Sequence, residues 1–329
     1  MKAIKILTMA ALATAVFASC SNEDGLPQSN YPADNVVRIM TSVDGMNTRA
    51  SYGNSADKLK SFGFCIKNAN SEKYTYDNIK VSQKRYNWIP ATQMLWQNST
   101  TAVDILAYAP YQETTEDANG KVKVFGKTDY AFSVKEDQSN AEDYSSDLIV
   151  YKQTGFKPGT ELNTSKAVDV TFTHLLSQLN LTIELRDQFN QDEKKPVTSA
   201  TVTDVKVDGT FIRSKVNFAA DPISFLRDGQ ASAAITPETV AFKKADKTTD
   251  HATFKYSAIV IPQKVIAGQL CIKFKVDGTD YIWTGTSDVE FVSGKKYDLL
   301  LLVGKDVVQV KGITATPWGK ETIIEKETD

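Results

Sequence analysis

Short runs of apolar and β-branched residues, separated by turn residues, make up most of the chain, and no sustained helical repeat follows the first segment. Such runs predict β-strands, because alternating or briefly continuous apolar residues suit a sheet with a buried face. The clearest runs are residues 121–125, 168–172, 179–185, 202–207, 255–261, 270–276 and 297–303. The pattern therefore predicts an all-β protein.

Pairs of Asn or Asp followed by Gly punctuate these runs. They predict tight hairpins, since both residue types tolerate the positive φ angles of a type I′ turn. The clearest hairpin spans residues 273–283 around Asp277-Gly278. Residues 175–179 have helical spacing, but the alternation over 181–185 predicts a strand with an irregular start.

A polar stretch at residues 154–166, rich in Gly, Pro and Ser, separates two apolar clusters and is the predicted domain boundary. The 329 residues suffice for two ordinary domains. Short antiparallel strands with hairpin turns predict a β-sandwich for each. We therefore expect two β-sandwich domains in tandem, over residues 50–165 and 166–329.

Residues 1–19 have the character of a secretory signal. Two lysines precede an uncharged apolar segment that is too short to span a bilayer as a helix. The small residues before Cys20 resemble a bacterial lipobox, which implies cleavage between Ser19 and Cys20 and acylation of Cys20, with palmitate among the expected lipids. Ordinary cleavage near Ala18, with Cys20 incidental, is the alternative.

The acidic residues 21–24 resemble the export signal of surface lipoproteins. They favour a location on the outer face of the outer membrane. Residues 20–49 would then be a lipidated pro-segment.

The charge and metal-ligand inventory excludes several classes of protein. The 38 basic and 40 acidic residues leave a net charge of −2, which gives no electrostatic reason to bind nucleic acid. Two His and three Cys without metal-ligand spacing argue against a zinc site. Cys65 and Cys271 lie in separate apolar runs, where free Cys packs as a small apolar residue, so no disulfide is expected.

No group of residues has the pattern of a catalytic site, and we expect neither an enzyme nor a metal or cofactor. His174 lies in an apolar run without a nearby nucleophile, so a structural role is favoured. A cavity that joined His174 or His251 to two carboxylates would instead suggest catalysis. Trp88 and Trp96 with Tyr86 could stack on a sugar, although a core position is favoured for Trp96.

Several segments, in order, resemble the fimbrillin-like proteins of Bacteroidetes, which form protease-matured pili. The run from Phe172 to Ser177 resembles the family's Phe-x-His-x-Leu-Ser pattern. The other segments are residues 59–64, 76–78, 95–111, 147–150, 260–263, 294–297 and 313–318.

The resemblance implies two transthyretin-like, Greek-key β-sandwich domains and a structural or adhesive role as the stalk, tip or anchor subunit of a fimbria. It implies assembly by strand addition. A trypsin-like protease removes the first strand, and a strand from another subunit fills the exposed groove. The ligand for adhesion is unknown.

Residues 35–43 match the removable strand, with Val37, Ile39, Thr41 and Val43 on one face. Arg49, before Ala50, is the expected cleavage site, because it follows this strand in a polar, turn-like context. Arg38 is a poorer candidate, because a cut there would split the strand. Arg49 as an ordinary surface residue is the alternative.

Residues 306–329 are the candidate donor segment. Alternatively, residues 297–318 complete their own domain, with Trp318 closing the end of the sandwich. A rival function is a monomeric surface lipoprotein that binds a glycan or peptide, which would need an exposed aromatic cluster on a concave face.

Overall fold

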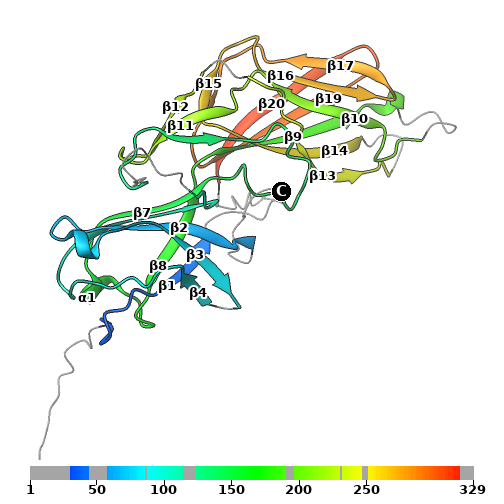
Figure 1. Cartoon of the computed structure of the whole chain (residues 1–329). Coiled ribbons are helices and arrows are strands. Elements are labelled where there is room, and N and C mark those ends of the chain that lie inside the picture. Colours follow the sequence, from blue (N-terminus) through cyan, green and yellow to red (C-terminus); the bar gives the residue numbers. More distant parts are fainter. Residues whose placement is uncertain are drawn as a thin grey trace, which may run out of the picture.

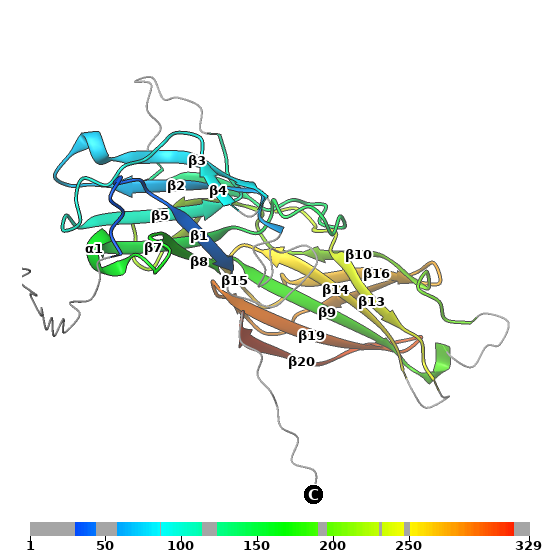
Figure 2. The same ribbon diagram turned by 90° about the horizontal axis from the view of Figure 1, so that it is seen from below.

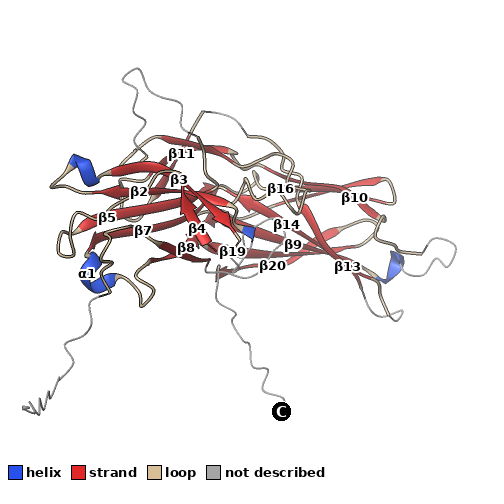
Figure 3. Cartoon of the chain, turned by 60° about the horizontal axis from the view of Figure 1, so that its bottom comes forward, coloured by secondary structure: helices blue, strands red, loops and turns tan. Residues whose placement is uncertain are grey.

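The computed structural model describes residues 30–43, 58–85, 87–113, 124–189, 196–229, 232–246 and 251–318. These residues form two β-rich units, one mainly from the first half of the chain and the other from the second (Figure 1). Strands supply nearly all of the regular structure (Figure 3). The predicted all-β fold of tandem sandwiches is confirmed.

A seven-stranded sheet forms the first unit. Its strands, in spatial order, are β1 (Ile39–Val43), β8 (Val168–His174), β7 (Ile149–Phe156), β5 (Val103–Ala109), β2 (Ser61–Lys67), β3 (Tyr76–Lys84) and β4 (Asn87–Pro90). Two short helical turns, η2 (Glu72–Tyr74) and α1 (Pro158–Glu161), lie in its connections. No helix among the described residues has the length and apolar character needed to cross a membrane.

The second unit contains a five-stranded sheet and three smaller ones. The five-stranded sheet comprises β13 (Glu238–Lys243), β14 (Ala252–Val260), β9 (Ser177–Leu185), β19 (Lys295–Val303) and β20 (Val308–Pro317). The smaller sheets comprise β10 (Val202–Asp208), β16 (Cys271–Val276) and β17 (Thr279–Thr284); β12 (Ser224–Arg227), β11 (Arg213–Asn217) and β6 (Tyr130–Ser133); and β15 (Gln263–Val265) with β18 (Val289–Phe291). A helical turn, η3 (Asp187–Phe189), follows β9.

Two strands lie in the unit of the other half of the chain. β6 precedes the boundary predicted between residues 165 and 166, but it pairs with β11 of the second unit. β8 follows that boundary but pairs with β1 and β7, and then leads within a few residues into β9 (Figure 2). The strand pairing therefore crosses the predicted boundary in both directions.

The apolar core consists of two clusters on opposite faces of the first sheet. One lies within the first unit and includes Phe62 and Phe172. The other includes Leu106 and Tyr108 of β5 and continues without interruption through the core of the second unit. Because burial of apolar surface drives folding, this shared cluster binds the two units to each other.

Most predicted strands are present, including those at residues 168–172, 179–185 and 297–303. The hairpin turn at Asp277-Gly278 has the expected positive φ angles, 51° and 84°. The start of β9 is irregular as predicted, because Leu175 and Leu176 lie outside both β8 and β9.

The prediction of a strand at residues 121–125 was wrong for its described part. Residues 121–123 lie outside the described residues, whereas Val124 and Phe125 belong to no strand. Their backbone N–H groups donate to Asp77 Oδ1, at 3.0 and 3.2 Å. The side-chain carboxylate therefore takes the place of a neighbouring strand.

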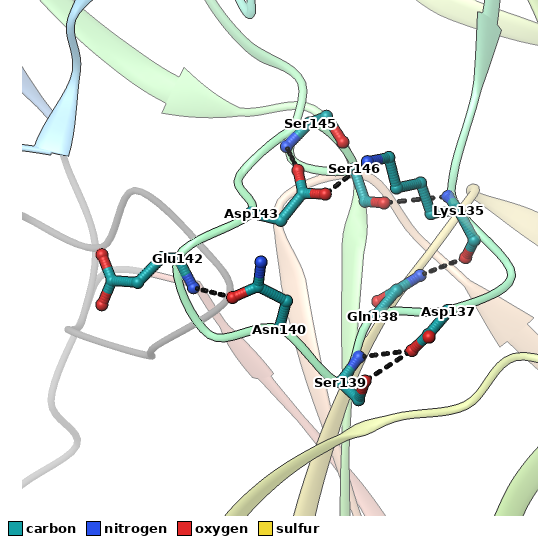
Figure 4. Close-up of polar contacts among 9 residues, drawn as sticks. All are labelled: Lys135, Asp137, Gln138, Ser139, Asn140, Glu142, Asp143, Ser145 and Ser146. Atoms are coloured by element: carbon teal, nitrogen blue, oxygen red, sulfur yellow. Dashed lines mark hydrogen bonds and ion pairs between the residues drawn. The ribbon is translucent and has the colours of Figure 1, made fainter.

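The connection between β6 and β7 is a polar loop whose side chains hydrogen-bond to other residues of the same loop (Figure 4). The loop also attaches to the second unit. Gln138, which is buried, donates from Nε2 to the carbonyl of Ile259 at 2.9 Å and accepts the N–H of Ile259 at 2.7 Å. Its own N–H donates to the carbonyl of Thr236 at 2.9 Å. These bonds satisfy backbone groups of β14 that would otherwise be buried without partners.

Replacing Gln138 with Leu should destabilise the protein by about 1–3 kcal/mol, because the paired backbone groups of Ile259 would lose their partner. Guanidinium unfolding of the purified chain measures the change. The matched control is Ser139→Ala, which alters an exposed neighbour in the same loop and should change stability by less than about 0.5 kcal/mol. Equal stabilities for the two variants would contradict this role of Gln138.

Candidate functional site

β1 lies at the edge of the first sheet and pairs with a single neighbour, β8. The pairing is parallel and aligns Ile39 with Val168 and Val43 with Phe172. The hydroxyl of Ser42 donates to that of Thr171 at 3.0 Å. This strand lies within the segment that the sequence predicts to be removable.

The side chains of β1 alternate between core and solvent. Val37, Ile39 and Val43 are buried in the cluster within the first unit, and Thr41 is half-buried on the same side. Met40, on the other side, is 48% exposed. The predicted apolar face of this segment is therefore the face that packs on the core.

Most of β8 has β1 as its only partner among the described strands. β7 aligns with β8 only at His174 and Thr173, so residues 168–172 have no ladder with it. Three apolar side chains of β8, those of Val168, Val170 and Phe172, are fully buried beside β1. Loss of β1 would expose both a row of backbone polar groups and an apolar groove.

The residues immediately before β1 attach it to the rest of the first unit. Val36 forms an isolated antiparallel bridge with Leu95, and the N–H of Val37 donates to the carbonyl of Met94 at 3.0 Å. Trp96, next along the chain, is buried and stacks on Phe156 with ring centroids 5.7 Å apart. Trp96 is thus a core residue, as the sequence favoured.

Arg38 forms an exposed ion pair at the start of β1. Its guanidinium lies 2.6 Å from Asp34 Oδ2. The hydrogen bonds from Arg38 and from the N–H of Val36 lower the pKa of Asp34 to about 2. Arg38 also accepts, through its carbonyl, the N–H of Val168 at 2.9 Å. A protease would have to break these contacts before it could cut at Arg38.

A groove of about 620 Å³ separates β1 from β4, on the side of β1 that faces away from β8. Trp88 and Ile89 of β4 line one wall, and residues 36–41 line the other. Trp88 is half-buried and lies 5.1 Å from the ring of Phe62. Tyr86 lies outside the described residues. Trp88 is the single aromatic residue among the groove's described lining.

β20 is an edge strand of the second unit and pairs antiparallel with β19. Lys295 of β19 aligns with Pro317 of β20, and Val303 aligns with Val308, with one bulge between these pairs. Nearly all of its side chains are exposed or half-buried, including Val310 at 44% and Ile313 at 36%. A groove of about 410 Å³ runs along its apolar side, lined in part by Trp283 and Tyr297. β20 therefore completes its own sheet, the alternative that the sequence left open, but contributes little to the core.

The end of β20 meets the end of β8. The rings of Trp318 and His174 stack with centroids 3.9 Å apart and planes 2° apart. His174 Nδ1 lies 2.9 Å from Asp147 Oδ1, and both side chains are buried. His174 thus has the structural role that the sequence favoured.

The remaining titratable candidates form no catalytic arrangement in the described part of the chain. His251 is partly exposed, and its ring nitrogens lie 3.5 Å from Glu184 and 3.6 Å from Asp187. The described residues contain no cluster that could hold a metal ion. Cys65 and Cys271 are both free, and burial raises the pKa of the Cys65 thiol.

Ser19, Cys20, Arg49 and Ala50 lie outside the described residues, so lipidation and cleavage at these positions remain predictions.

The described residues thus form two joined β-sandwich units, with a first strand whose apolar face packs on the core and a last strand at an exposed sheet edge. The profile of the fimbrillin-like family matches residues 48–318, and the chain belongs to that family. Family membership supports a role as a fimbrial subunit or in cell adhesion, at the cell surface and with other fimbrial subunits as partners. Members are structural subunits, and the chain is not an enzyme.

Solved structures share the fold. A candidate cell adhesion protein from Bacteroides uniformis is 20% identical, with a TM-score of 0.55 over 87% of this chain and 99% of that one. Another from Bacteroides ovatus is 12% identical, with a TM-score of 0.61 over the same shares. No curated protein matches the chain.

The packing of β1 predicts that substitutions on its buried face lower stability far more than substitutions on its exposed face. Replacing Ile39 with Ala should lower the free energy of unfolding by about 2–5 kcal/mol, because it leaves a cavity in the core. Met40→Ala, one residue further on and exposed, should change it by less than about 0.5 kcal/mol. Chemical denaturation of both variants tests this, and similar losses would show that β1 is not packed as described.

Proposed function

We propose that the chain is the precursor of a fimbrial subunit that assembles by exchange of its first strand. It is exported as an outer-membrane surface lipoprotein through acylation of Cys20. A trypsin-like protease then cuts after Arg49. The processed subunit receives a strand from another subunit at the place that β1 leaves.

The observation that carries this proposal is the dependence of β8 on β1. Arg49 lies between β1 and β2 in the sequence, so a cut after it severs every covalent link from β1 and Cys20 to the rest of the fold. β1 would then be held only by non-covalent contacts. Its departure would leave residues 168–172 without a neighbouring strand and would uncover the surrounding apolar side chains.

An open groove of this kind favours an incoming strand. Main-chain hydrogen bonds give affinity, and side chains at alternate positions fill the pockets that Val37, Ile39 and Val43 vacate. Each buried apolar Å² contributes about 25 cal/mol. A strand that fills the groove therefore stabilises the processed subunit.

The proposed donor lies within residues 306–329, of which β20 is the described part. Val310 and Ile313 are partly exposed in their own subunit, at 44% and 36%. Transfer to a groove would bury these side chains. β20 itself lies at a sheet edge, where β19 is its only ladder partner among the described strands.

Arg49→Ala should abolish maturation. The wild-type protein recovered from cells should begin at Ala50, whereas the variant should retain Cys20 with its lipid and β1. N-terminal sequencing and intact mass distinguish the two forms. Arg38→Ala is the control and should be processed normally. Recovery of wild-type protein only as the lipidated form beginning at Cys20 would rule out the cleavage.

A synthetic peptide of residues 306–329 should stop the growth of polymers from processed subunits, because it would fill the groove without offering a groove of its own. Light scattering follows the assembly. A control peptide with Asp at positions 308, 310 and 313 should have no effect, since charges cannot enter an apolar groove cheaply. Unchanged polymer growth with the wild-type peptide would place the donor elsewhere in the chain.

A further inference from the structure

The end of β20 is anchored by Trp318, which differs from the rest of the strand in its burial. Trp318 is 7% exposed, whereas the residues of β20 are exposed or half-buried throughout. Its backbone N–H donates to the carbonyl of Gly294 at 2.7 Å. Its ring lies flat on that of His174. The end of the strand is therefore held by an aromatic contact with His174 of the first unit and by a backbone hydrogen bond to Gly294.

His174, the partner of Trp318, is fixed in turn by the first unit. It is the last residue of β8, and Asp147 Oδ1 lies 2.9 Å from its Nδ1. The following residue, Leu175, donates its N–H to the carbonyl of Leu148 at 2.9 Å. The ring that receives Trp318 thus has its position set by β8 and by the chain that precedes β7.

β8 is itself positioned by β1. Residues 168–172 of β8 form their described ladder with β1, and only the last two residues align with β7. A continuous series of contacts therefore runs from β1 through β8 and His174 to Trp318 and β20. Its two ends are the strand proposed to be removed and the strand proposed to be donated.

We propose that the stack of Trp318 on His174 is a latch that couples the two ends of strand exchange. While β1 fixes β8, the latch keeps β20 in its own sheet. Removal of β1 loosens β8, weakens the stack and frees the end of β20. This proposal rests on the strand exchange proposed above and adds the order of its steps.

The latch has a physical reason. Before maturation the groove is filled by β1, so a donor strand released early has no groove to enter. A freed β20 would expose its own apolar side chains and also the unpaired edge of β19, which invites non-specific association. If β20 is released only after β1 is lost, its apolar side chains and the edge of β19 are exposed only in subunits whose groove is already open.

Hydrogen exchange measured by mass spectrometry on the uncleaved chain, which still carries β1, tests the coupling without any assembly. Ile39→Asp places a charge in the core beneath β1 and should detach that strand. The amides of residues 308–318 should then exchange about tenfold faster, as expected for loss of an aromatic stack and its burial. Met40→Asp, an equal charge on the exposed face of the same strand, should leave them unchanged. Ile39→Ala offers the same comparison if the Asp variant does not fold.

Trp318→Ala supplies the reciprocal measurement, because coupling between two sites acts equally in both directions. It should speed exchange in residues 308–317 and also in β1 and β8, whereas Trp318→Phe should restore most of the protection. A side chain that merely plugs the sandwich would affect β20 and its neighbours but not β1.

The coupling is wrong if Ile39→Asp deprotects β1 while residues 308–318 keep wild-type exchange. It is equally wrong if Trp318→Ala leaves β1 and β8 unaffected. β13 should keep its protection in every variant, and its loss would assign the effect to general unfolding instead of the latch. Failure of assembly with the coupling intact would refute the strand exchange and leave the contact itself established.

Discussion

The parallel pairing of β1 with β8 is the interaction on which the first unit depends. It closes one edge of the seven-stranded sheet and covers the apolar side chains of both strands. A five-residue strand far from its partner in sequence is costly to bring into place, because a long loop must close before the contact forms. Its buried face repays that cost. The same face makes the sheet vulnerable once the covalent link to β1 is lost.

The local structure was largely accessible from the sequence. Period-two alternation marked β8 and β9, a continuous apolar run marked β19, and Asp277-Gly278 marked a hairpin, because side-chain direction and φ preference are local properties. The apolar face of residues 37–43 followed from the same alternation. The family resemblance then supplied a role for that strand, which the residues alone did not.

The pairing between segments that are distant in sequence could not be predicted from local patterns. Nothing local to residues 168–174 shows that they belong beside residues 39–43, and the polar stretch before them suggested a boundary instead. The failed strand at Val124 and Phe125 has a similar cause, since the carboxylate that binds their N–H groups lies at Asp77, far away in sequence. The stack of Trp318 on His174 likewise joins two segments that a single sequence cannot relate.

The first and last strands of this fold differ in how much apolar surface they bury. β1 has its apolar side chains in the core and pairs with a strand that has few other described partners, so its removal uncovers buried apolar surface. β20 leaves Val310 and Ile313 partly in water and pairs at the edge of a five-stranded sheet, so its removal uncovers little core. A strand whose apolar side chains are poorly buried in its own subunit is stabilised when it enters an apolar groove, whereas a strand that is already well buried is not. This asymmetry gives strand exchange a direction, from the C-terminal edge of one subunit to the open first sheet of the next.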